Sequence, residues 1–213
     1  MRYVSEEKQQ NILNAAAEIF AEKGYYQASI QNITQKAGVS TGTFYIYYKN
    51  KEEVLLSIYN QFSEYLNSEI EKKLSRQYSD SIEKLIICTA SVVKFYASNS
   101  QLSLILLTKT IGMSKLSEKE YYKVFNQICE IFMKIISEIG SGEFDDIYIN
   151  SIAYVQIVNG LTAQWIAYSA QRSLADLIYM IITYNFNALK IPADSDYIKK
   201  NIMSEIFEIE REY

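Results

Sequence analysis

A single proline, Pro192, is present in the 213 residues of this chain, together with only seven glycines. Proline and glycine are the residues that interrupt helices most strongly, so long stretches of this chain are free to remain helical. Within these stretches apolar residues recur at spacings of three and four, which places them on one face of a helix. The sequence therefore predicts an all-α protein, and a hydrophobic content of 49% is enough for a sizeable core.

Two short helical patterns meet at a glycine in the segment 29–53. Ser29 is expected to cap the first helix, because its hydroxyl can accept a hydrogen bond from an unpaired backbone N–H group. Gly38 is suited to the left-handed conformation that ends a helix, and Ser40 or Thr41 can cap the second helix almost at once. Two short helices joined by a turn of three or four residues that contains glycine form a helix-turn-helix.

The second helix of this motif is expected to have one face in the core and one face without charge. Phe44 and Tyr48 are four residues apart and should both face the core. The other positions carry small, hydroxylated or aromatic side chains: Thr41, Gly42, Thr43, Tyr45, Ile46 and Tyr47. Short side chains let a helix approach DNA closely, and hydroxyl and backbone N–H groups can bond phosphate oxygens. Asn50 and Glu53 then form a variant capping box for a helix whose first residue, Lys51, adds a positive charge.

The sequence GTFYIYYKNKEEVL, with the preceding ITQKAGVS, resembles the DNA-binding region of TetR-type transcriptional regulators. The resemblance extends upstream through ILNAAAEIFAEKGYYQASI and covers roughly residues 11–60. It implies a three-helix helix-turn-helix DNA-binding domain at 1–50, followed by a larger helical ligand-binding and dimerisation domain at 51–213. It also implies that residues 51–75 form a helix connecting the two domains.

The same resemblance implies a function, a ligand-responsive regulator bound to a palindromic operator in double-stranded DNA. The protein is expected to repress transcription. Repression ends when a small molecule changes the separation or tilt of the two DNA-binding domains of the dimer. The net charge is −4, and residues 1–56 carry six basic and six acidic side chains. Because DNA binding depends on positive charge, one alternative stays open, a helical small-molecule-binding protein that no longer binds DNA.

By resemblance, the DNA contacts fall on nine positions: Ser29, Ser40, Thr41, Gly42, Thr43, Tyr45, Ile46, Tyr47 and Lys51. Contacts to base edges or thymine methyl groups are expected from Thr41, Thr43, Tyr45 and Ile46. Phosphate contacts are expected from Ser29, Tyr47 and Lys51, with Arg2 and Lys8 as auxiliary contacts. Many relatives have lysine at the position of Thr41 and tyrosine at that of Ile46. We expect these two departures to weaken phosphate attraction and to shift specificity toward A·T-rich sites.

Two long segments near the C-terminus, 147–171 and 177–189, contain no charged residue. The first is a poor candidate for a membrane span, because polar side chains occur along its length, among them Asn150, Gln156, Asn159, Thr162 and Gln164. A helix without a charged face has no obvious side for water, so we expect burial on more than one side. The sequence therefore predicts a homodimer through the helices in 147–190, joined as a four-helix bundle. The alternative is complete burial inside one chain.

Nineteen tyrosines and nine phenylalanines provide surface for a largely apolar or aromatic effector. Seven aromatic residues are candidates to line its pocket: Tyr96, Tyr121, Tyr122, Phe125, Phe132, Trp165 and Tyr168. Glu130, Asn159 and Gln164 are candidates to orient the effector. The competing interpretation of each is an ordinary structural residue, because aromatic side chains at helical spacing usually pack in cores.

Capping signals predict further helix boundaries. Asp80 is expected to cap a helix after a break at 76–80, and Ser117 with Glu120 to form a capping box. The last segment, 193–213, has isoleucines at helical spacing, so we expect a terminal helix docked on the body of the protein.

The chain contains no histidine, and its two cysteines, Cys88 and Cys129, have no metal-ligand residues near them in the sequence. No nucleophile motif, phosphate-binding loop or cluster of metal ligands is present, so we expect no enzyme, no metal and no cofactor. Catalysis by carboxylates alone is the enzymatic alternative left open. The N-terminal sequence MRYVSEEKQQ lacks the apolar region of a signal peptide. Together with isolated thiols, this predicts a cytoplasmic protein.

Overall fold

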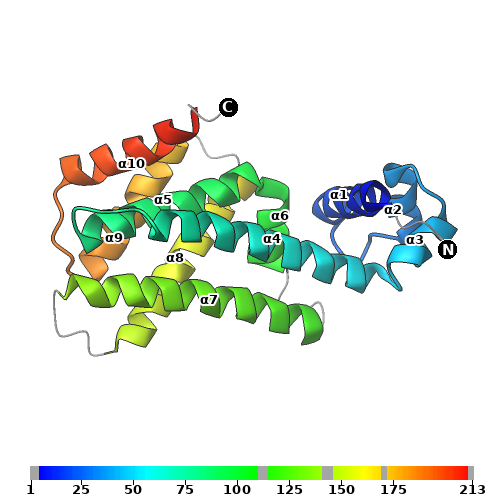
Figure 1. Cartoon of the computed structure of the whole chain (residues 1–213), viewed down its shortest axis with the longest axis horizontal. Helices are drawn as coiled ribbons and strands as arrows, with labels where there is room; N and C mark the ends of the chain where they lie inside the picture. Colours follow the sequence, from blue (N-terminus) through cyan, green and yellow to red (C-terminus); the bar gives the residue numbers. More distant parts are fainter. Residues whose placement is uncertain (1–4, 110–114, 141–145, 169–171, 211–213) are drawn as a thin grey trace. The chain divides into compact units, whose positions relative to one another are not determined.

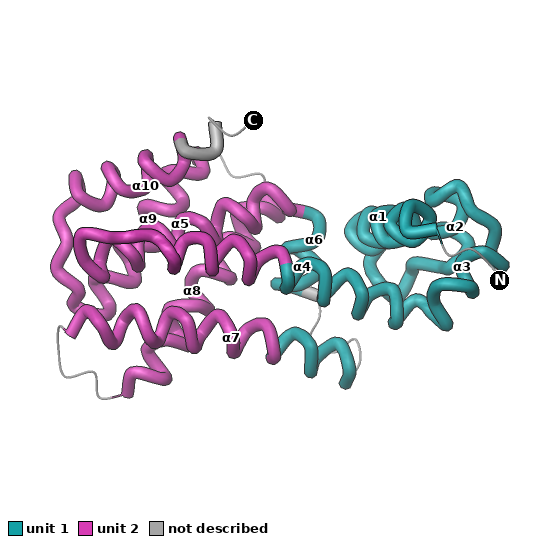
Figure 2. The backbone as a smooth tube through the Cα atoms, viewed as in Figure 1, with its two compact units in different colours: residues 1–64, 101–122 teal, residues 65–100, 123–213 magenta. Residues whose placement is uncertain are grey.

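The computed structural model describes residues 5–109, 115–140, 146–168 and 172–210. Every regular element within these ranges is helical, which confirms the predicted all-α class (Figure 1). The chain divides into two compact units, each made of two segments (Figure 2). The first unit contains residues 1–64 and 101–122, and the second contains residues 65–100 and 123–213.

The first unit contains a small three-helix assembly near the N-terminus. Its helices are α1 (Glu6–Lys23), α2 (Ile30–Ala37) and α3 (Thr41–Tyr47), followed by the first part of α4 (Lys51–Leu74). Their shared core is apolar and fully buried: Ile12, Ala16, Phe20, Ile33, Phe44 and Val54. The second segment of this unit holds all but the first residue of α6 (Ser100–Leu104), a short π-helical turn η1 (Ile105–Lys109) and the start of α7 (Lys115–Ile139).

Local capping determines where these short helices begin and end. The Ser29 hydroxyl accepts a hydrogen bond from the backbone N–H of Asn32, and the Asn32 side chain accepts one from the backbone N–H of Ser29. Gly38 ends α2 in the left-handed conformation, with φ of 66°. Ser40 then caps α3 by accepting from the backbone N–H of Thr43. The predicted caps and turn of the helix-turn-helix are therefore confirmed.

The second unit is arranged around α5 (Ser81–Ser98). Residues 85–96 of this helix are all buried, which is expected when neighbouring helices cover it on every side. It packs against α8 (Ile147–Ala167), α9 (Leu174–Ala188) and α10 (Ser195–Glu210). The rest of this unit consists of the last turns of α4 and most of α7.

Most of the later boundaries agree with the sequence, and one was wrong. Asp80 caps α5 by accepting from the backbone N–H of Glu83, as predicted. The terminal helix is present as α10, and the burial of Ile198 and Ile202 confirms that it docks. Ser117, however, does not cap a helix, because α7 already begins at Lys115 and the Ser117 side chain is buried within it.

Candidate functional site

The two faces of α3 differ as the sequence predicts. Phe44 is fully buried and Tyr48 is 3% exposed, so both belong to the core. On the opposite face Tyr45 is 55% exposed and Ile46 is 41% exposed, next to the exposed Thr41. The helix therefore presents an uncharged surface of hydroxyl, aromatic and aliphatic groups to its surroundings, where water alone would favour charged side chains.

Gly42 leaves open space on this exposed face. A Cβ atom added at Gly42 would meet only the Ser40 hydroxyl, at 3.7 Å, which is an ordinary contact distance. Its backbone does not adopt the left-handed conformation that favours glycine. Because packing within the described chain does not require glycine here, its use fits an external surface that approaches the α3 backbone closely.

Tyr47 lies at the end of α3 and is tied to the start of α1. The Tyr47 hydroxyl accepts a hydrogen bond from the backbone N–H of Ser5 at 2.9 Å. It also donates to the backbone oxygen of Ser5 at 3.1 Å. The sequence predicts a phosphate contact from this hydroxyl, whereas the structure uses it to hold α3 against α1.

Lys51 has a structural role that sequence analysis does not predict. Its ammonium group donates to the backbone oxygens of Tyr25 at 2.7 Å, Ala28 at 3.1 Å and Tyr26 at 3.3 Å. It also lies 4.5 Å from the centre of the Tyr25 ring, and burial lowers the pKa of Lys51. An ammonium group has three N–H donors, so this geometry directs them into the link between α1 and α2.

The other positively charged side chains of this unit differ in their exposure and in the ion pairs that they form. Lys36 forms ion pairs with Glu18 at 2.5 Å and Glu22 at 3.0 Å, which together raise the pKa of Lys36 and join α2 to α1. Lys8 is exposed, whereas Arg2 lies outside the described residues. Lys49, which the sequence analysis did not single out, is exposed in the link between α3 and α4.

A separate cavity of about 490 Å³ lies in the second unit between α4, α5 and α7. This volume falls within the range of roughly 300–1,000 Å³ that is usual for small-molecule sites. Its lining combines three aliphatic residues with polar and charged ones: Leu74, Ile131, Ile135, Asn67, Gln127, Glu71, Glu130, Lys84 and Lys134. Lys84 also pairs with Glu138 at 3.0 Å, and this contact lowers the pKa of the Glu138 carboxyl.

Of the ten residues predicted to contact an effector, only Glu130 lines this cavity. Tyr96, Phe125, Phe132 and Asn159 are buried, and the Phe132 ring stacks on Tyr154 with centroids 5.2 Å apart. The others are exposed or partly exposed: Tyr121, Tyr122, Gln164, Trp165 and Tyr168. The structure therefore does not bring the ten together. The cavity residues missed by sequence analysis are mostly polar, and on amphipathic helices their spacing resembles that of a solvated face.

Helices α8 and α9 expose a group of large apolar side chains: Tyr148, Ile149, Leu161, Tyr168, Met180 and Tyr184. The hydroxyl oxygen of Thr162 on α8 is buried and has no hydrogen-bond partner within the described part of the chain. We refer to the six exposed side chains as the α8–α9 surface. None of the helices that the structure describes is both long and apolar enough to span a membrane.

Comparison with known proteins shows which regulators this chain is similar to. Residues 12–58 match the family model described as "Bacterial regulatory proteins, tetR family". The chain is 29% identical over 136 residues to the fatty acid metabolism regulator protein of Bacillus subtilis, covering 62% of this chain and 66% of that protein. The aligned region thus spans slightly less than two thirds of this relative's length.

Two solved structures share the fold over most of the chain. A TetR-like transcriptional regulator from a Rhodococcus species has a TM-score of 0.76 at 16% identity, covering 90% of this chain and 100% of that one. FadR from Bacillus subtilis in complex with stearoyl-CoA has a TM-score of 0.71 at 22% identity, covering 83% and 96%. The match over residues 12–58 identifies this N-terminal region as one of the TetR family of bacterial regulatory proteins, and the two likenesses show that most of the chain shares the all-helical fold of these regulators.

Proposed function

We propose that this protein is a ligand-responsive transcriptional regulator that reads DNA with the exposed face of α3. The observation that carries the proposal is the uncharged face made by Thr41, Tyr45 and Ile46, beside the open backbone at Gly42. A helix with this surface fits a major groove, where threonine and isoleucine can contact thymine methyl groups. Thr43 is also assigned to this face, although its hydroxyl lies 2.9 Å from that of Ser40.

The phosphate contacts are proposed to come from groups beside α3. Ser29 and Ser40 cap helices whose first N–H groups suit an anion, and Lys49 supplies a positive charge between α3 and α4. Lys51 and Tyr47 support this surface from behind, through the carbonyl and Ser5 contacts described above. This division of roles replaces the direct phosphate contact that the sequence predicts for Lys51.

The active form is proposed to be a homodimer joined through the α8–α9 surface. This surface carries large apolar side chains such as Leu161 on α8 and Tyr184 on α9, and α8 has no charged residue along its length. A stable dimer buries about 800 Å² on each partner, which two helices packed against their copies can supply. Two-fold symmetry then requires an inverted-repeat operator, with half-sites separated by one helical turn of about 34–36 Å or a multiple.

The effector is proposed to be a long-chain acyl thioester of coenzyme A, bound at the cavity between α4, α5 and α7. One relative is a fatty acid metabolism regulator, and one structural neighbour is in complex with stearoyl-CoA. The cavity supports this class, because Leu74, Ile131 and Ile135 are aliphatic and Lys84 and Lys134 can attract an anionic head group. The protein is proposed to act as a repressor. An effector that favours the non-binding state by about 1–3 kcal/mol changes operator occupancy by roughly 5–150-fold.

Fluorescence anisotropy tests the DNA-binding proposal. The protein is titrated into a labelled duplex from its own upstream intergenic region and into a scrambled duplex, at several salt concentrations. We expect tighter binding to the native duplex, with affinity that falls as salt rises. Tyr45→Ala should weaken this preference, whereas Phe207→Ala, which truncates an exposed aromatic on α10, should not. Equal, weak binding to this duplex and to a selected pool of genomic fragments would favour the alternative small-molecule-binding protein.

The effector proposal is tested on the same protein–DNA complex with stearoyl-CoA. We expect stearoyl-CoA to release the duplex, and Lys134→Met to raise the concentration needed. Lys119→Met on the same helix is the matched control, because Lys119 is exposed and does not line the cavity. Release that is unchanged in Lys134→Met would move the effector to another site, and no release would reject this effector class.

A further inference from the structure

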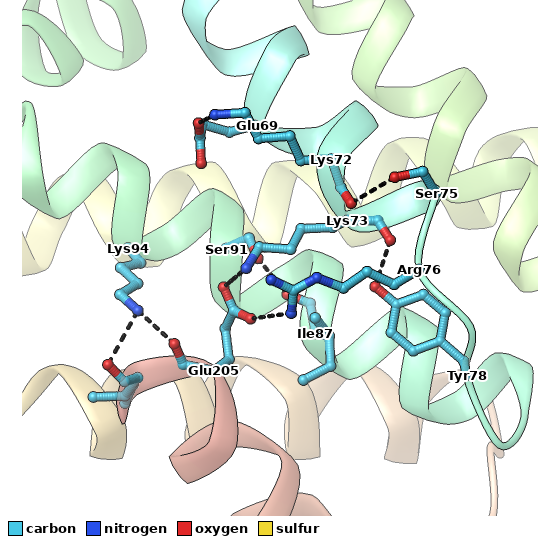
Figure 3. Close-up of polar contacts among 11 residues, drawn as sticks. Glu69, Lys72, Lys73, Ser75, Arg76, Tyr78, Ile87, Ser91, Lys94 and Glu205 are labelled. Carbon is cyan, nitrogen blue, oxygen red and sulfur yellow. Dashed lines mark hydrogen bonds and ion pairs between the residues drawn. The ribbon is translucent and has the colours of Figure 1, made fainter. Parts of the chain in front are cut away.

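A buried carboxylate in the C-terminal helix connects three helices of the second unit (Figure 3). Glu205 on α10 is 1% exposed. Its Oε1 atom lies 2.6 Å from the ammonium nitrogen of Lys73 at the end of α4, and it accepts a hydrogen bond from the Ser91 hydroxyl of α5 at 2.9 Å. The Arg76 guanidinium, just beyond α4, lies 3.8 Å from the other carboxylate oxygen.

A second lysine holds the backbone of the same turn of α10. The Lys94 ammonium group, on α5, donates to the backbone oxygens of Glu205 at 2.5 Å and Ile206 at 3.3 Å. Lys73 and Lys94 are both buried, at 7% exposure each. The turn of α10 around Glu205 is therefore held to α4 through its side chain and to α5 through its side chain and its backbone.

Contacts of this kind constrain position more than apolar packing does. Removing charged groups from water costs several kcal/mol for each ion, and their attraction offsets this cost only when the geometry is good. Apolar residues of similar size often stabilise a protein as well or better. A buried pair between Glu205 and Lys73 therefore favours one relative placement of α10 and α4, because sliding by one turn would leave both charges unpaired.

The part of α4 that carries Lys73 also lines the cavity. Asn67, Glu71 and Leu74 contribute to the cavity wall, so an occupant there would touch the same last turns of the helix. Helix α4 is continuous over 24 residues, which corresponds to a length of about 36 Å. It starts at Lys51, shortly after α3 ends at Tyr47. The C-terminal end of α4 is thus held by α10, and a molecule bound in the cavity would contact the same end.

We propose that Glu205 is a latch that fixes the C-terminal end of α4 to α10 and α5. In this arrangement α10 acts as a strap, so α4 can shift only if the Glu205–Lys73 contact breaks or α10 moves with it. The latch exists whether or not the cavity binds an effector. Its consequence for DNA binding rests on the proposed function, whereas its local effect on α4 does not.

Hydrogen–deuterium exchange measured by mass spectrometry tests the latch in the full chain without any ligand. Glu205→Gln should accelerate exchange in peptides from residues 65–76 by roughly ten-fold or more, because local opening there loses a buried charged contact. Exchange in α8 and α9 should stay close to that of the unchanged protein. The matched control is Glu138→Gln, which removes the partly exposed pair with Lys84 and should have less than about a five-fold effect at any site.

Ser91→Ala provides a milder second variant if Glu205→Gln does not fold. It removes one hydrogen bond to Glu205 and leaves the charges paired, so the same peptides should respond by a smaller factor. Uniform acceleration over α5, α8 and α9 would show that Glu205 only stabilises the unit as a whole and would overturn the latch. The latch is equally overturned if residues 65–76 exchange alike in Glu205→Gln and Glu138→Gln. Loss of DNA binding or of stearoyl-CoA response, by contrast, bears on the proposed function alone.

Discussion

The ammonium nitrogen of Lys51 lies 2.7 Å from the backbone oxygen of Tyr25, so the first residue of α4 is joined to the link between α1 and α2. That link leads directly into Ser29, the N-cap of the first helix of the helix-turn-helix. The contact therefore constrains the position of the link that precedes α2 relative to the start of α4. A lysine at this position would otherwise be expected to contact phosphate directly, and the two roles predict different behaviour in salt.

Lys51→Met should lower the affinity for DNA without changing its salt dependence. It removes hydrogen bonds from a charged donor to three carbonyls, so we also expect a loss of about 1–3 kcal/mol in the free energy of unfolding. Lys49→Met is the contrasting variant. Loss of one phosphate contact in each subunit of the proposed dimer should reduce the slope of log K against log salt by about 1.8, or about 0.9 for each contact. Anisotropy titrations at several salt concentrations measure both. If Lys51→Met reduces the slope as Lys49→Met does, Lys51 contacts phosphate.

Thr41→Lys and Ile46→Tyr introduce the residues that the resemblance to TetR-type regulators implies at these two positions. Both side chains are exposed on α3, so either change can be made without disturbing the core. Thr41→Lys should tighten DNA binding and steepen the salt slope by about 1.8, the effect of one added phosphate contact in each subunit of the proposed dimer. Ile46→Tyr should tighten binding through a hydroxyl–phosphate hydrogen bond. If neither variant gains affinity, the proposed loss of phosphate attraction is wrong.

A charge placed on the α8–α9 surface should separate the proposed dimer. Leu161→Glu puts a carboxylate on an exposed site of α8, where it costs little in one chain but several kcal/mol when buried in an interface. Analytical ultracentrifugation should then show a single-chain mass. Phe207→Glu changes a comparably exposed residue on α10 and should leave the mass unchanged. If the protein carrying Leu161→Glu keeps the mass of a dimer, the interface lies elsewhere.

Both cysteines should be unreactive in the folded protein. Burial raises the pKa of Cys88 to about 12 and that of Cys129 to about 11, from an ordinary value of 9.0. At pH 8 both thiols therefore stay protonated, and labelling with a thiol reagent should be slow until the protein unfolds. The unfolded state loses these protons first, so the thiols reduce stability progressively as the pH rises above about 9. Rapid labelling of a chain with unchanged helical circular dichroism would contradict the burial.

Features that depend on a few neighbouring residues could be predicted from the sequence. Ser29, Gly38, Ser40 and Asp80 act within one turn of their own positions, so their capping roles were predictable. The burial of Phe44 beside an uncharged exposed face also follows from helical periodicity alone.

The meeting of distant groups became visible only in the folded chain. Lys51 contacts carbonyls more than twenty residues earlier in the chain, and Lys73 meets Glu205 from the opposite end of the second unit's sequence. The cavity likewise joins polar residues of three helices, of which sequence analysis selected only Glu130. A backbone oxygen has no sequence signature, and a buried charge resembles a solvated one until its partner is placed. These contacts depend on how whole helices pack, which no local pattern specifies.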